Sequence, residues 1–335
     1  MFSSVSCYPL SFDMSVGWSL FVPLFVSLLF GWHISAVPLS PSDTLPERRS
    51  DIAGPRFVVY TDRFVPAHSG PPSVSEVQGF NVVVLSFLLI AGPYDKAAEW
   101  AQLAPDQRAS IKSQYAAAGK KLLVSAFGST DVPTTAGADP VATANTMAAW
   151  VKQYDLDGID VDYEDLNAMT AGDGKAEAWL TAFTKQLRVH LPRNQYIITH
   201  APLAPWFSPS HWGGGAYITV DKNVGNLIDW YNVQYYNQGF LEYITCPGLI
   251  TASSPTWPQT AVFQIAAQGV PLNKLVIGKP AVPAVDATNG WMDPLTLSLC
   301  LRQAKEAGWN AGVMTWQYPE GGSPWITVVK SQAWP

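Results

Sequence analysis

The sequence predicts an α/β protein built as a single-domain (β/α)8 TIM barrel. Eight short apolar, strand-like runs follow one another along the chain, and helix-sized intervals separate them, which is the alternation of such a barrel. The chain of 335 residues, of which 48% are hydrophobic, can bury the core that a barrel of about 250 residues requires. We expect the strands at Phe57–Tyr60, Val82–Leu89, Leu122–Ala126, Gly158–Tyr163, Tyr196–His200, Trp230–Tyr235, Leu275–Gly278 and Gly312–Gln317.

The intervals between these runs carry helix-end signals. Asp139 followed by Pro140 is typical of a helix N-cap and first turn, and predicts a helix that continues to about Tyr154. Gly119 and Gly308 stand where glycine commonly ends a helix. The intervals are therefore expected to be the helices of the barrel.

The N-terminal region has a different composition from the rest of the chain. The run Val16–Phe30 is almost wholly apolar and is followed by small residues, which predicts a signal peptide over residues 1–36 and a secreted, extracellular protein. A retained membrane anchor is the alternative. Residues 37–55 read as a linker or pro-segment, in which Arg48–Arg49 is a candidate processing site. The catalytic barrel is expected over residues 56–335.

Charge and cysteine content limit the partners that the protein can have. The formal net charge is -6 and the pI is about 5.3, so the chain has no basic surface for nucleic acid or for an anionic membrane. Cys246 and Cys300 remain after signal removal, and they are compatible with a disulfide or with two buried thiols. The histidines show no metal-binding spacing, and nothing indicates an oligomeric state.

Three carboxylates fall on one face of the predicted strand Gly158–Tyr163 and its end. Side chains alternate along a strand, so Asp160, Asp162 and Glu164 share one face while apolar residues occupy the other. A calcium loop or a solvated turn would not carry apolar residues at the alternate positions. Burial raises the pKa of a carboxyl group, so we expect Glu164 to hold a proton at the barrel mouth and Asp160 and Asp162, which lie deeper, to share one.

This segment resembles the DGxDxDxE motif of glycoside hydrolase family 18, the chitinases and endo-β-N-acetylglucosaminidases. The matching residues are Asp157, Gly158, Asp160, Asp162 and Glu164. The resemblance implies a retaining glycosidase without metal or organic cofactor, in which the acetamide oxygen of the substrate attacks the anomeric carbon. Glu164 would protonate the leaving oxygen, and Asp162 would hold the acetamide N–H group.

The resemblance also implies residues that bind the substrate. They come from the ends of the first, second, sixth and eighth predicted strands, where such barrels place their pockets. Those residues are Tyr60, Phe87, Gln234, Tyr236, Asn237 and Trp316. Tyr236 would donate its hydroxyl to the acetamide oxygen, and Trp316 would form an aromatic floor beneath the sugar.

One position departs from the family pattern, and the substrate stays open. Phe127 replaces a glycine after the third predicted strand, so we expect it to narrow the space near the sugar or to move its loop outward. The favoured substrate is chitin or its oligosaccharides, and the N-glycan chitobiose core is the alternative. A non-catalytic lectin is a further alternative. The loop tryptophans Trp206, Trp212, Trp257 and Trp291 are candidates for a stacking wall or for core.

Overall fold

The computed structural model describes residues 52, 54–66 and 69–335. The predicted signal peptide and Arg48–Arg49 lie outside the described residues, as does most of the predicted linker.

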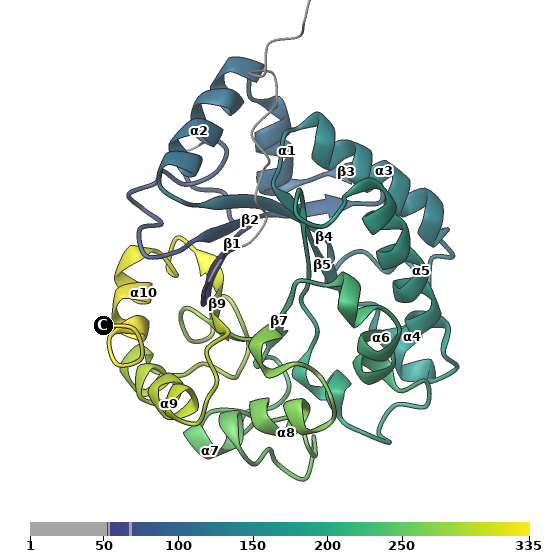
Figure 1. Ribbon diagram of the computed structural model, residues 1–335, viewed down its shortest axis with the longest axis vertical. Coiled ribbons are helices and arrows are strands. Elements are labelled where there is room, and N and C mark those ends of the chain that lie inside the picture. Colours follow the sequence, from purple (N-terminus) through teal and green to yellow (C-terminus); the bar gives the residue numbers. More distant parts are fainter. Residues whose placement is uncertain (1–51, 53, 67–68) are drawn as a thin grey trace, which may run out of the picture. The chain divides into compact units, whose positions relative to one another are not determined.

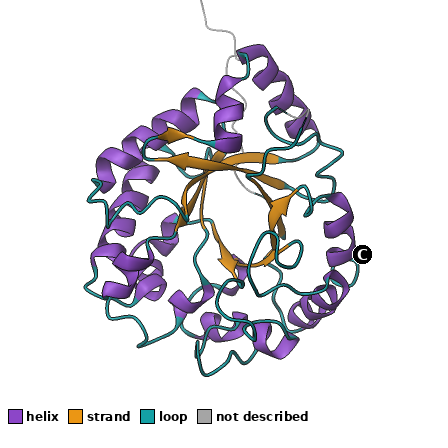
Figure 2. Cartoon of the chain, turned by 180° about the vertical axis from the view of Figure 1, so that it is seen from behind, coloured by secondary structure: helices purple, strands orange, loops and turns teal. Residues whose placement is uncertain are grey.

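The described residues form a closed barrel of parallel strands, which confirms the predicted fold. The strands form the inner ring in Figure 1 and Figure 2, and the helices lie around it. Neighbouring strands follow the order β1-β9-β8-β7-β6-β5-β4-β2, and β1 also pairs with β2, so the ring closes. The strands are β1 (Arg56–Thr61), β2 (Val82–Leu89), β4 (Lys121–Gly128), β5 (Gly158–Tyr163), β6 (Ile197–His200), β7 (Trp230–Gln234), β8 (Leu275–Pro280) and β9 (Gly312–Tyr318).

Each predicted strand is present, and its ends lie within two residues of the predicted ones. A short additional strand, β3 (Gly92–Pro93), pairs antiparallel with the end of β2 and lies outside the ring. The helices are α1 (Asp95–Gln102), α2 (Pro105–Ala117), α3 (Pro140–Gln153), α4 (Leu166–Ala171), α5 (Lys175–His190), α6 (Ala216–Val224), α7 (Cys246–Ile250), α8 (Val262–Ala267), α9 (Pro294–Glu306) and α10 (Ser323–Lys330).

The predicted helix ends are confirmed by their geometry. Asp139 caps α3, because its Oδ1 accepts a hydrogen bond of 2.7 Å from the backbone N–H of Ala142. Gly119 follows α2 and Gly308 follows α9, with φ angles of 66° and 98°. These left-handed conformations favour glycine and end the helices.

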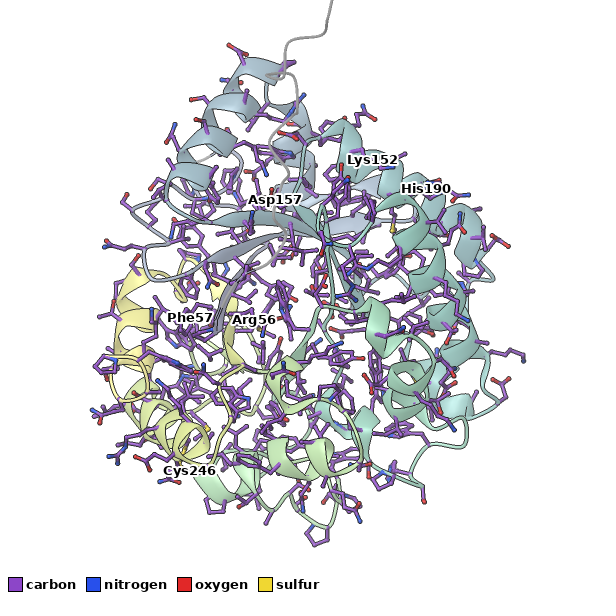
Figure 3. All side chains as sticks on the ribbon, viewed as in Figure 1. Arg56, Phe57, Lys152, Asp157, His190 and Cys246 are labelled. Atoms are coloured by element: carbon purple, nitrogen blue, oxygen red, sulfur yellow. A yellow bond between two sulfur atoms is a disulfide. The ribbon has the colours of Figure 1, made fainter. Side chains whose placement is uncertain are left out.

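Cys246 and Cys300 form a disulfide, which decides between the two possibilities left open by the sequence. Their Cα atoms are 4.9 Å apart, and the bond joins α7 to α9 (Figure 3). Among the described residues, no helix is long and apolar enough to cross a membrane.

The strand faces divide as the alternation predicts. Ile159, Val161 and Tyr163 of β5 are fully buried on the side of the helices, where the ring of Tyr163 lies against Trp179 of α5. The opposite face of β5 carries Asp160 inside the barrel. The interior of this barrel is thus polar near β5, and its polar groups bond to one another.

Candidate active site

Asp160 is fully buried inside the barrel and is held by side chains from four other strands. Two of them, Ser125 and Thr199, are its register partners on β4 and β6. The donors are Tyr60 Oη (2.7 Å) and Ser125 Oγ (2.8 Å) to Oδ2, and Thr199 Oγ1 (2.5 Å) and Asn232 Nδ2 (3.2 Å) to Oδ1. Burial raises the pKa of Asp160, and these four hydrogen bonds act against that rise. Asp160 therefore anchors the interior and does not meet a ligand.

The carboxyl groups of Asp162 and Glu164 lie together at the next level toward the mouth. Nε2 of Gln234 on β7 lies 2.9 Å from Asp162 Oδ1 and 3.2 Å from Glu164 Oε1, so one amide touches both carboxyl groups. It also bonds to the carbonyl of Ala201 at 2.9 Å, which fixes its orientation. The amide thereby sets the position of both acids.

The carboxyl groups of Asp162 and Glu164 both bind a proton more tightly than ordinary carboxyl groups, because their pKa values are raised. Burial raises the pKa of both carboxyls, and the charges of Glu164 and then Asp160 raise that of Asp162 further. We expected Asp160 and Asp162 to share a proton, whereas in the structure Asp160 accepts four hydrogen bonds from neutral donors and Asp162 shares the amide of Gln234 with Glu164. The pair can thus keep one proton at a pH at which an ordinary carboxyl group has lost it.

A cavity of about 270 Å³ lies above this pair. It brings together seven of the predicted site residues, namely Asp162, Glu164, Phe87, Gln234, Tyr236, Asn237 and Trp316. Burial, followed by the charges of Asp162 and Glu164, raises the pKa of Tyr236 well above its usual value. Its hydroxyl therefore stays protonated and can donate a hydrogen bond.

Tyr60 does not line the cavity, so the structure gives no support to its predicted contact with the substrate. It is 2% exposed, and its hydroxyl donates to Asp160 while accepting a hydrogen bond of 3.0 Å from Asn232. Tyr60 points inward as expected, but it lies one level below the pocket. Its ring centroid is 5.9 Å from that of Trp316, so it supports the pocket floor from beneath.

Asp157 and Gly158 lie at the opposite end of β5 and support the motif structurally. Asp157, labelled in Figure 3, accepts a hydrogen bond of 2.8 Å from the backbone N–H of Leu122 and pairs with Lys112. A Cβ atom on Gly158 would lie 2.0 Å from the carbonyl oxygen of Ile197. Only glycine lets β5 and β6 approach this closely.

Phe127 does not line the pocket, so of its two expected effects the narrowing of the space near the sugar is not seen. Its φ of 78° breaks the strand alternation, and its buried ring packs against Trp179 and Phe183 of α5. Of the four loop tryptophans, Trp206 is core, stacked on Tyr217 at 5.8 Å. The other three, Trp212, Trp257 and Trp291, are half-buried and contribute nothing to the cavity wall described above.

The loop that carries Tyr236 is held by a buried lysine that the sequence did not reveal. Lys279 of β8 is fully buried, and its Nζ donates to the carbonyls of Tyr235 (2.9 Å), Tyr243 (2.7 Å) and Gly290 (2.9 Å). Burial lowers the pKa of Lys279, while three carbonyl acceptors match the three N–H groups of its charged form. Lys279 thus joins the loops after β7 and β8.

The geometry agrees with the comparisons to known proteins. Residues 56–325 match the family model described as glycosyl hydrolases family 18. The chain belongs to this family. A chitinase from Enterococcus faecalis is 28% identical over 232 residues, which make up 65% of this chain and 64% of that protein. The chain therefore spans less than two thirds of the length of that relative.

Solved structures of family 18 proteins share the fold. A chitinase structure from Pseudoalteromonas aurantia is 25% identical with a TM-score of 0.61, and covers 83% of this chain and 99% of its own. A fungal endo-β-N-acetylglucosaminidase of family 18 is 20% identical with a TM-score of 0.59, and covers 82% and 96%. The second likeness shows the fold alone.

The pocket of this family 18 protein contains residues that sequence reasoning missed. They are the acids Asp62 and Asp95 and the hydroxyl residues Ser129 and Thr130. Asp286 also lines the pocket, and its position near a strand end had made it a candidate for the pocket wall or the surface. Asp62 and Ser129 directly follow β1 and β4, so the rule that strand ends line the mouth could have found them. Asp95 and Asp286 lie further along their loops, where no periodicity shows the direction of a side chain.

Arg63 ties the wall of the pocket together on the side where the first and last strands meet. Its Nη2 lies 2.7 Å from Asp286 Oδ1, and its Nη1 bonds to Glu320. Gln317 Oε1 accepts hydrogen bonds of 3.1 Å from the backbone N–H groups of both Asp62 and Arg63. No group of three or more potential metal ligands is found among the residues that the structure describes.

Proposed function

We propose that the protein hydrolyses GlcNAc-β-1,4-GlcNAc bonds of chitin and its oligosaccharides with retention, by substrate-assisted catalysis. Family membership and the pocket support a glycosidase, and the names of similar proteins favour chitin. The partner is accordingly an N-acetylglucosamine-containing polysaccharide or glycan.

The shared contact of Asp162 and Glu164 with the Gln234 amide carries the proposal about mechanism. Two carboxyls that act from opposite sides of a glycosidic bond stand about 5–5.5 Å apart in retaining enzymes and about 6.5–9.5 Å apart in inverting ones. Asp162 and Glu164 both accept hydrogen bonds from the one amide of Gln234, at 2.9 and 3.2 Å, so they act from the same side. The nucleophile must then come from elsewhere, and the acetamide oxygen of the substrate can supply it.

The shared proton gives each acid its role. When the proton is on Glu164, this residue can protonate the leaving oxygen and later take a proton from the attacking water. Asp162 is then a carboxylate that accepts the acetamide N–H and stabilises the positive oxazolinium ring. Tyr236 donates to the acetamide oxygen, and Trp316 stacks beneath the sugar.

We also propose that the protein is secreted, which the signal-peptide composition of residues 1–36 supports. Expression of the full chain in a secreting host tests this. Recovery from the medium with an N-terminus after residue 36 is the expected result. Retention of residues 1–36 in the membrane fraction would mean a membrane anchor.

The deciding experiment for the substrate is mass spectrometry of the products. The protein and its Glu164→Gln variant are incubated with chitin hexaose and with a glycoprotein that bears N-glycans. Shorter N-acetylated oligomers from hexaose, absent with the variant, are expected. A single GlcNAc left on asparagine would identify an endo-β-N-acetylglucosaminidase, and binding without cleavage would identify a lectin.

The mechanism is tested on the same oligomers. Proton NMR of the first product should show the β-anomer before mutarotation, since retention restores the starting configuration. Replacing the acetamide of the cleaved sugar by trifluoroacetamide should lower kcat/KM strongly, because its carbonyl oxygen is a weaker nucleophile. An unchanged rate would assign the attack to a protein group instead.

A further inference from the structure

Asp165, which directly follows Glu164, is a fully buried acid to which the proposed mechanism gives no role. Its Oδ2 accepts a hydrogen bond of 2.6 Å from the backbone N–H of Thr135. Its Oδ1 accepts bonds from the Thr135 hydroxyl (2.5 Å) and from the backbone N–H of Ala168 (3.1 Å). Hydrogen bonds to a carboxylate are stronger than those between neutral groups. Asp165 therefore joins the end of β5 firmly to the loop that carries Thr135.

The residue on the other side of Glu164 is attached to the same loop. The hydroxyl of Tyr163 donates a hydrogen bond of 2.9 Å to Oγ1 of Thr134. Glu164 thus lies between two residues that bond to consecutive threonines. The backbone N–H of Leu166 also bonds to the carbonyl of Glu164 at 2.8 Å, which closes a tight turn directly after the acid. The backbone that carries the Glu164 side chain is therefore held on both sides.

The loop that holds these residues, 129–139 between β4 and α3, is fixed by hydrogen bonds of its own. The backbone N–H of Ala138 bonds to the carbonyl of Pro133 at 2.9 Å, which folds the loop into a compact turn. The indole N–H of Trp179 on α5 donates a bond of 2.7 Å to the carbonyl of Ala138. Thr135 is therefore a fixed anchor.

The same loop begins at the pocket. Ser129 and Thr130 line the cavity together with Glu164. They follow Phe127 and Gly128, whose φ angles of 78° and 74° turn the chain out of the strand conformation at the end of β4. The loop therefore connects one wall of the pocket to the backbone of the acid.

We propose that Asp165 is a positioning residue, which holds the Glu164 carboxyl at the leaving oxygen of the substrate through its bonds to Thr135. Asp165 does not itself line the cavity, so it acts through the backbone of Glu164. An acid must lie within hydrogen-bond reach of the oxygen that it protonates, and a displacement of about 1 Å can lower a rate by about 100-fold. The inference rests on the proposed function, in which Glu164 is the general acid.

Asp165→Asn tests this role with two substrates that have different leaving groups. The change keeps the side-chain shape but replaces one acceptor oxygen by an amide N–H₂ group, which cannot accept both bonds from Thr135. The value of kcat/KM is measured for chitotetraose, whose sugar leaving group needs a proton, and for dinitrophenyl chitobioside, whose phenolate leaves without one. We expect kcat/KM to fall about tenfold for chitotetraose and by less than about threefold for the dinitrophenyl substrate.

Two substitutions of Thr135 examine the same link from the loop. Thr135→Val removes the hydroxyl and keeps the backbone N–H, so a smaller loss with the same dependence on the leaving group is expected. Thr135→Ser keeps both donors and should retain the original kcat/KM for both substrates. If Asp165→Asn does not fold, the comparison of these two variants decides in its place.

Asp139→Ala is the control for a loss of stability in the same loop. It removes the N-cap bond of 2.7 Å to Ala142, so the melting temperature should fall while the ratio of the two kcat/KM values stays unchanged. An equal fall for both substrates in Asp165→Asn, or no fall, would overturn the positioning role, because misfolding lowers both values alike. Absence of cleavage by the unsubstituted protein would refute the proposed function, and this inference with it.

Discussion

Replacing Tyr60 by Phe tests whether this residue supports the site or binds the sugar. The change removes the 2.7 Å hydrogen bond to Asp160 and the acceptor of the 3.0 Å bond from Asn232. Asn232 keeps its longer bond of 3.2 Å to Asp160 Oδ1, and Ser125 still donates to Oδ2, the oxygen that loses the Tyr60 hydroxyl. The dominant loss is one hydrogen bond to a buried carboxylate, so the free energy of unfolding should fall by about 2–3 kcal/mol. The melting temperature should fall by about 6 °C.

The same change has a pH signature. The Tyr60 hydroxyl favours the ionised form of Asp160, so its removal raises the pKa of Asp160 further. The loss of stability should be largest at neutral pH, where the carboxylate is charged. It should decline as the pH falls through the raised pKa of Asp160, because a neutral carboxyl loses only about 1 kcal/mol with one hydrogen bond.

Denaturant unfolding at neutral and at mildly acidic pH measures the loss of stability. The KM for chitin hexaose shows whether the substitution also weakens substrate binding. Tyr163→Phe is a matched control, because it removes a 2.9 Å bond between the Tyr163 hydroxyl and Thr134, where no carboxylate takes part. The control should lose about 1 kcal/mol at both pH values. A tenfold rise of KM in the Tyr60 variant with unchanged stability would refute our reasoning and place its hydroxyl against the sugar.

Three further substitutions probe the frame of the site. Gly158→Ala should lower the free energy of unfolding by about 3 kcal/mol or more, because the new Cβ meets the Ile197 carbonyl; an unchanged denaturation midpoint would contradict this. Lys279→Met leaves three buried carbonyl groups without a hydrogen-bond donor, so both the melting temperature and kcat/KM should fall. A loss of stability with unchanged kcat/KM would mean that Lys279 does not shape the pocket. Cys300→Ala opens a bridge between residues 54 apart, a loss of about 4 kcal/mol. The melting temperature of the Cys300→Ala variant should match that of the unsubstituted protein after reduction. A further fall when reductant is added to the variant would contradict the assignment of this stability to the disulfide.

The sequence revealed the parts of the site that obey strand periodicity. Asp160, Asp162 and Glu164 could be placed on one face because alternation within β5 is regular, and the polar β7 residue Gln234 followed in the same way. Strand periodicity predicts which face of the sheet a side chain lies on, but not how deep along the barrel axis it lies. Tyr60 was therefore placed in the pocket when it lies beneath it.

Positions where the backbone leaves the strand conformation could not be predicted. Phe127 turns outward because of its positive φ, and nothing in the neighbouring residue types indicates that turn. Asp286 reaches the pocket from within a loop, and its direction depends on Arg63, which is more than 200 residues away in the sequence. Such contacts depend on the closed ring and leave no local pattern.

The joining of the first and last strands has a consequence for how activity arises during folding. The contacts that shape the β1–β9 side of the pocket link residues separated by 223 to 257 positions, such as Arg63 with Asp286 and with Glu320. Contacts between such distant segments form late, because closing the long loop between them costs conformational entropy. An intermediate with most strands paired would still lack the floor at Trp316 and the wall at Asp62. Sugar binding would therefore report closure of the ring, and a ligand would stabilise only the chain in which the last strand has docked.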